Sequence, residues 1–129
     1  MEQLVERRLE LAVPASTIWR ALTRGPELST WFGADVELEP RLGGRATFTW
    51  PDGTQRDASI EVFEPHRHLL LRWLPFQRDA TGATRPTAPG SIRFVIEEAE
   101  HHAVLYITES LAGQARTMSL SGSAREGAG

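Results

Sequence analysis

The fold is decided by the stretch from Val13 to Phe32, which reads VPASTIWRALTRGPELSTWF. Ser16 lies two residues after Pro14 and can accept a backbone N–H as an N-cap. The apolar residues after it recur at helical spacing, and the pair Gly25-Pro26 interrupts them before a second apolar cluster begins. The stretch therefore predicts two short helices that pack together, with apolar positions at Ile18, Trp19 and Leu22, and at Leu28, Trp31 and Phe32.

Strands are predicted on both sides of these helices. Residues 4–13 form the first, and the segments after the helices alternate apolar and polar side chains, as in a sheet with one buried face. Residues 69–74 do not alternate, so burial on both faces and a central place in the sheet are expected there. Six strands are expected after the helices: 36–38, 46–50, 58–62, 69–74, 91–97 and 104–108.

Two adjacent helices inserted after the first strand of a hairpin-rich chain predict an α+β domain with a curved antiparallel sheet. The segment from Pro75 to Gly90 is expected to be irregular because it is rich in Thr, Ala, Gly and Pro. A loop of that length is expected to be either the mobile rim of a binding site or a disordered hairpin tip.

The composition favours one small domain in the cytoplasm. The chain has 129 residues, an apolar fraction of 40%, a formal net charge of -3 and no cysteine. The charge gives no bias toward nucleic acid, and the lack of cysteine excludes disulfides and Cys-ligated zinc. For this reason no nucleic acid is expected as a partner. No membrane is expected either, because no stretch approaches the roughly 20 apolar residues of a membrane span.

An ordered series of short motifs resembles the family named for the activators of the ATPase of heat-shock protein 90, a branch of the START-like helix-grip superfamily. The resemblance implies a helix-grip fold, in which helices lie against a curved sheet, and it covers roughly Val5 to Leu111. Its motifs are the stretch quoted above, Gly43-Gly44, WPDG at 50–53, VFEPH at 62–66 with LLLRW at 69–73, VIE at 95–97 and ITES at 107–110.

The chain departs from this family pattern at its C-terminal end. Helix-grip domains close with a long amphipathic helix, whereas residues 112–129 are rich in Gly and Ser and offer few large apolar side chains. We therefore expect a START-like domain over residues 1–111 and a flexible tail over 112–129. An uncovered sheet would expose aromatic surface, so we expect the chain to form a homodimer or to associate in another way. Because a Gly/Ser tail should bury little surface, deleting residues 121–129 should leave the melting temperature unchanged.

The candidate ligand-binding residues are apolar and mostly aromatic, as expected for a pocket that buries a small hydrophobic molecule. Arg72 and Glu97 lie among apolar strand residues and are the candidate polar anchors; the structural alternative is an ion pair between Arg72 and a glutamate of a neighbouring strand, among Glu64, Glu97 and Glu109. The candidates for the apolar wall are Trp31, Phe32, Phe48, Trp50, Ile60, Leu71, Trp73, Phe94 and Tyr106.

No catalytic residue, cofactor or metal site is assigned. The chain contains no phosphate loop, no Gly-x-Ser-x-Gly motif and no His-Glu-x-x-His motif. His66 and His68 could face one metal ion from a strand, but no carboxylate follows at a ligand spacing, and surface turn histidines are the simpler interpretation.

The first functional hypothesis is a non-enzymatic domain that binds a small hydrophobic ligand between sheet and helices. The second, implied by the resemblance, is a co-chaperone-like module that docks on an ATPase chaperone. The third is an enzyme of the cyclase or hydrolase kind, with a Glu or His as general acid or base. The superfamily hosts all three activities, so the fold alone does not choose among them.

Overall fold

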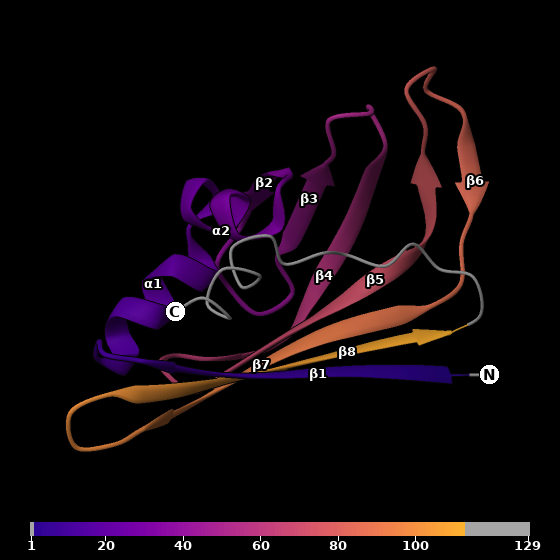
Figure 1. The fold of residues 1–129 in the computed structure, drawn as a ribbon. Helices are drawn as coiled ribbons and strands as arrows, with labels where there is room; N and C mark the ends of the chain where they lie inside the picture. The colour runs from indigo at the N-terminus through magenta and orange to yellow at the C-terminus, as the bar shows by residue number, and fades with distance from the viewer. Residues whose placement is uncertain (1, 113–129) are drawn as a thin grey trace.

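The computed structural model describes residues 2–112 (Figure 1). Two helices follow the first strand, and all the remaining elements are strands, so the predicted α+β architecture is confirmed. The expectations about a missing C-terminal helix and a flexible tail concern residues beyond Ala112 and lie outside the described part. The elements are β1 (Glu2–Leu11), α1 (Ala15–Thr23), α2 (Gly25–Phe32), β2 (Asp35–Leu38), β3 (Arg45–Thr49), β4 (Gln55–Glu64), β5 (His68–Arg78), β6 (Thr84–Pro86), β7 (Gly90–Glu98) and β8 (Ala103–Ala112).

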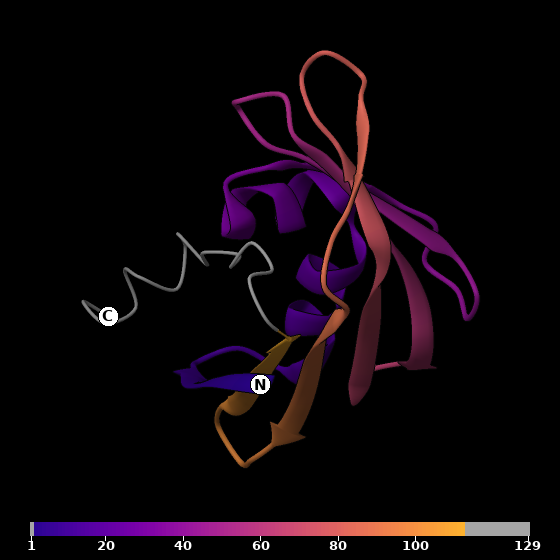
Figure 2. The same cartoon turned by 90° about the vertical axis from the view of Figure 1, so that its right-hand side faces the viewer.

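The strands form one antiparallel sheet in the order β1-β8-β7-β5-β4-β3-β2, with β6 paired to the end of β5. The sheet is curved, and both helices lie on one side of it (Figure 2). β5 lies between β7 and β4, and its residues Leu69, Leu70 and Leu71 are all buried. The predicted central place of this strand is therefore confirmed.

We call the face of the sheet that meets the helices the inner face, and the opposite face the outer face. Phe32 at the end of α2 packs edge-on against Phe48 of β3 and Phe94 of β7, with ring centroids 5.6 and 6.2 Å apart. Trp19 of α1 packs in the same way against Phe63 of β4 at 5.1 Å. These contacts fix the helices on the sheet and bury the apolar faces that the sequence predicted.

The start of α1 differs from the predicted Ser16 cap. Pro14 is the N-cap residue, and no side chain of α1 caps the helix. The N–H of Ala15 instead donates to the Glu98 carboxylate, 3.4 Å away on β7. A carboxylate near a helix N-terminus offsets the positive end of the helix dipole, so a residue distant in sequence takes the role expected of Ser16. Neither helix in residues 2–112 has the length and apolar character needed to cross a bilayer.

Most of the segment from Pro75 to Gly90 is an ordered hairpin rather than the irregular loop predicted. β5 continues to Arg78, and β6 pairs back on it over three residues. The Asp79 carboxylate closes the turn by accepting hydrogen bonds from the backbone N–H groups of Thr81 and Ala83 at 3.0 and 3.1 Å. Such Asx-type contacts stabilise a turn without any apolar side chain, which is why an apolar pattern did not reveal it.

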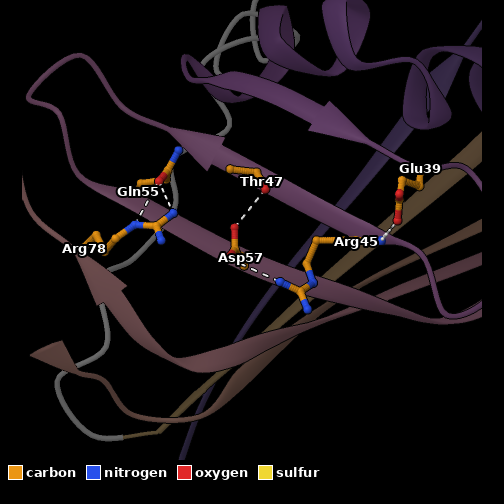
Figure 3. Close-up of polar contacts among 6 residues, drawn as sticks. All are labelled: Glu39, Arg45, Thr47, Gln55, Asp57 and Arg78. Atoms are coloured by element: carbon orange, nitrogen blue, oxygen red, sulfur yellow. Dashed lines mark hydrogen bonds and ion pairs between the residues drawn. The ribbon is translucent and has the colours of Figure 1, made fainter. Parts of the chain in front are cut away.

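The outer face is covered with polar pairs (Figure 3). The Asp57 carboxylate accepts a hydrogen bond from the Thr47 hydroxyl at 2.8 Å and lies 3.5 Å from the Arg45 guanidinium. The Arg78 guanidinium donates to the Gln55 amide oxygen from the next strand. These charged groups are therefore satisfied locally, while Ala46, Phe48, Ala58 and Ile60 of β3 and β4 are buried on the inner face.

Candidate functional site

An aromatic cluster on the inner face is the first component of the candidate site. Phe48 is its centre: its ring stacks on Trp50 at 6.0 Å and meets Trp73 edge-on at 4.9 Å, in addition to the contact with Phe32. Phe48 and Phe94 are fully buried, whereas Trp31 and Trp50 are half-buried. The cluster thus runs from the core to a partly exposed edge.

A buried arginine ends this cluster. Arg56 of β4 is only 2% exposed, and its guanidinium lies over the Trp73 ring at 4.9 Å from the centroid. Its Nη2 donates to the Leu74 carbonyl at 3.1 Å and to the Thr87 hydroxyl at 2.9 Å. A buried guanidinium lowers stability when it has no partners. Here the Leu74 carbonyl of β5 and the hydroxyl of Thr87, directly after β6, serve as its partners.

The charge of Glu109 on β8 acts on the pKa of this arginine, and the Glu109 side chain is itself buried, with 5% exposure. Burial lowers the pKa of the Arg56 guanidinium from its ordinary value, and the charge of Glu109 opposes that change. Two opposite charges therefore lie within the apolar face, and their fields partly cancel.

Strand alternation places the predicted anchors on the outer face. Arg72 pairs with Glu61 of the adjacent strand, with 2.9 Å between Nε and the carboxylate, and both side chains are exposed. This confirms the structural alternative of an interstrand ion pair, but with Glu61 in place of the three glutamates considered. Glu97 is exposed and accepts a hydrogen bond from the Tyr106 hydroxyl at 3.4 Å.

Tyr106 lies on the outer face for the same reason. Its neighbours Leu105 and Ile107 are buried, and successive side chains of a strand point to opposite faces. The Arg8 guanidinium of β1 lies 6.0 Å from the Tyr106 ring centroid. Tyr106, Arg72 and Glu97 are therefore separated by the sheet from the aromatic cluster.

The other wall residues share the inner face. Ile60, Leu71 and Phe94 are at most 1% exposed and form part of the core. Only Trp31 and Trp50 among the wall candidates combine contact with the core and partial exposure. Arg56 was not among the candidates. It lies two residues before Ala58 and four before Ile60, so strand alternation puts it on the same buried face of β4, and this spacing is the signal that could have identified it.

The histidines do not converge on a metal. The His66 ring packs edge-on against Trp19 at 6.4 Å, while His68 contacts Arg93 and lies 3.8 Å from the Glu64 carboxylate. Within residues 2–112 no group of three or more His, Asp or Glu side chains has the geometry to hold a metal ion.

A surface hollow of about 220 Å³ lies at another place in the fold, where the β7–β8 turn meets the link from β1 to α1. None of the predicted wall or anchor residues lines it. Its lining residues are Ala12, Val13, Pro14, Glu98, Ala99, Glu100, His101 and His102.

Comparison with solved structures shows the helix-grip fold. The crystal structure of protein MLL2253 from Mesorhizobium loti superposes with a TM-score of 0.72 at 19% identity, over 87% of this chain and 79% of that one. Protein Mll3558 from Rhizobium loti gives 0.70 at 13% identity, over 99% and 90%. The conserved protein EF2215 from Enterococcus faecalis gives 0.67 at 22% identity, over 90% of this chain but 60% of its own length.

At sequence identities this low, the similarity to these structures is evidence for a shared fold and not for a shared function. No curated protein matches the sequence. The family model described as "Activator of Hsp90 ATPase homolog 1-like protein" matches residues 12–128. This match spans most of the chain and confirms the resemblance seen in the sequence motifs, so the chain belongs to the family of activator of Hsp90 ATPase homolog 1-like proteins.

Proposed function

We propose that this chain is a non-enzymatic cytoplasmic domain that binds a small hydrophobic molecule on the inner face of its sheet. The observation that carries the proposal is the aromatic cluster that runs from the half-buried Trp50 through Phe48 to Trp73 and ends at the buried Arg56. Apolar walls with a few oriented polar groups are the usual composition of small-molecule sites.

The energetics favour a flat, aromatic ligand. Each aromatic pair is worth about 0.5–1.5 kcal/mol beyond the area it buries, and a planar guest can extend the stack that Phe48 and Trp50 already form. Burial of apolar area adds about 25 cal/mol per Å² before the cost of association is subtracted.

The test uses a polarity-sensitive naphthalene dye and the intrinsic fluorescence of tryptophan. We expect saturable binding, a melting temperature that rises with dye concentration, and an affinity that falls by about tenfold in Trp50→Leu. Tyr106→Leu is the matched control, because it removes an aromatic ring from the outer face of the same sheet. Equal losses in both variants, or no saturable binding, would refute the proposal.

A co-chaperone-like activity is the second candidate, and the family match is the observation that favours it. In this case the chain would contact an ATPase chaperone through its surface and would need no apolar guest. The measurement is the ATPase rate of a purified heat-shock protein 90 with and without the chain. Stimulation that survives Trp50→Leu would favour this second candidate over ligand binding.

A further inference from the structure

Gln77 of β5 lies directly opposite Arg56 of β4. The two residues are register partners, and directly opposed residues of an antiparallel pair point to the same face. The preceding register pair, Gln55 with Arg78, points to the outer face, where the two side chains bond to each other (Figure 3). Gln77 is therefore on the inner face, beside the buried guanidinium.

Both side chains keep one buried polar atom without a hydrogen-bond partner. The Nη2 of Arg56 is used by Leu74 and Thr87, but its Nε–H is not used. The Oε1 of Gln77 is also buried and has no partner. In the described part of the chain these are the two buried side-chain polar atoms in that condition. Natural folds rarely leave such atoms unpaired, and each one costs about 1–3 kcal/mol.

One atom is a donor and the other is an acceptor. Arginine can only donate, and the oxygen of a glutamine amide can only accept. A single group that satisfies both must therefore accept one hydrogen bond and donate another. A hydroxyl group does so, because it carries one O–H and two lone pairs.

We propose that Arg56 Nε–H and Gln77 Oε1 recognise a hydroxyl group on the hydrophobic ligand. This inference rests on the proposed function and adds to it a chemical class: a flat apolar molecule that carries a hydroxyl at one end. The Arg56 guanidinium over Trp73 places the polar end beside the aromatic wall, so the ring system and the hydroxyl are bound at adjoining positions.

Other polar groups fit this pair less well. An ether or a ketone accepts from Arg56 but leaves the Gln77 oxygen unpaired. A carboxylate has no proton to donate, and it would add a second negative charge to a face that already contains Glu109. A hydrocarbon leaves both atoms unpaired. The expected order of affinity is therefore hydroxyl first, ether and ketone next, and hydrocarbon and carboxylate last.

The test compares three probes of nearly the same size: naphthol, methoxynaphthalene and methylnaphthalene, each substituted at the same ring position. We expect naphthol to bind about tenfold more tightly than methoxynaphthalene. Gln77→Met should remove this preference while methylnaphthalene binds as before. Gln55→Met is the matched control, because it makes the same change one strand away on the outer face, and it should keep the full preference.

A second readout uses the wild-type chain alone, so that it does not depend on a variant that folds. The Nε–H resonance of Arg56, assigned in the wild-type chain by through-bond NMR, should move further downfield with naphthol or methoxynaphthalene than with methylnaphthalene. Methylnaphthalene is the reference, because the ring current of a bound naphthalene shifts the resonance without any hydrogen bond. The additional downfield shift with the two oxygen-bearing probes reports the hydrogen bond.

The outcomes separate this inference from the proposed function. If all three probes bind with equal affinity and shift the Arg56 resonance by the same amount, the ligand site stands and the hydroxyl specificity is refuted. If none of the probes binds at millimolar concentration, both are refuted. If naphthol is preferred equally by Gln77→Met and by the wild-type chain, the hydroxyl is bound elsewhere and the assignment to this pair is wrong.

Discussion

Replacing Phe48 by alanine tests whether the aromatic cluster is packed as closely as its ring distances indicate. Phe48 is fully buried, and its ring packs against those of Phe32, Trp50 and Trp73. A buried Phe→Ala change costs about 3–5 kcal/mol, because the removed ring leaves a cavity that the surroundings fill only in part. Because the change also removes the ring interactions with all three neighbours, we expect about 4 kcal/mol, a large share of the roughly 5–15 kcal/mol that stabilises a domain.

Urea denaturation followed by tryptophan fluorescence measures this loss. For an m-value of about 2 kcal/mol per M, the unfolding midpoint should fall by about 2 M at unchanged m. Phe76→Ala is the matched control: its ring is 36% exposed on the β5–β6 hairpin, and its removal should cost less than about 1 kcal/mol. A cost below about 1.5 kcal/mol for Phe48→Ala would refute a tightly packed cluster.

Three further predictions concern the turns and the charged groups. Gly53→Ala should destabilise the fold more than Gly43→Ala in the same urea assay: both glycines have positive φ, but only at Gly53 would an added Cβ lie 2.6 Å from another atom. Burial, aided by the charge of Arg93, lowers the pKa of His68, so the unfolded chain binds a proton more readily and stability should fall as the pH drops below about 6.5. His68→Gln should reduce that slope between about pH 5 and 7, and an unchanged slope would contradict it. Arg56→Met should destabilise the fold, and adding Glu109→Leu should recover most of the loss, since the remaining buried charge is then removed; additive losses would contradict this account.

The order of elements could be predicted from the sequence because each depends on local periodicity. Apolar spacing near 3.6 residues marked both helices, alternation marked the strands, and the unbroken run at residues 69–74 marked the central strand. A hairpin tip was one of the two alternatives for residues 75–90, but its regular pairing was not predicted, because it pairs through its backbone and an Asp79 turn and has no apolar face to detect. The Ser16 cap was wrong because Glu98, far away in sequence, reaches the helix start instead.

The candidate site was only partly predictable, because a polar residue's face depends on register. Arg72 was selected for its place inside an apolar run, yet β5 is buried on both faces around Leu70, and Arg72 points outward. Gln77 could not have been paired with Arg56 from the sequence. The register between β4 and β5 shifts just after Arg56, so counting residues along the two strands gives the wrong partner.

Charged side chains are mostly exposed on the outer face of the sheet, whereas Arg56 and Glu109 are buried on the inner face. This contrast supports a functional interpretation of the inner face. On the outer face, pairs such as Arg72 with Glu61 are exposed and gain or lose little free energy. On the inner face, the buried charges of Arg56 and Glu109 cost stability that two apolar residues of similar volume would not, even with Thr87 and Leu74 as partners of the arginine. Packing alone gives no reason to retain the two charges. Arg56 Nε–H and Gln77 Oε1 are also buried without a partner. Polar groups that lower stability in this way are expected at a binding site more than in a core that only has to pack.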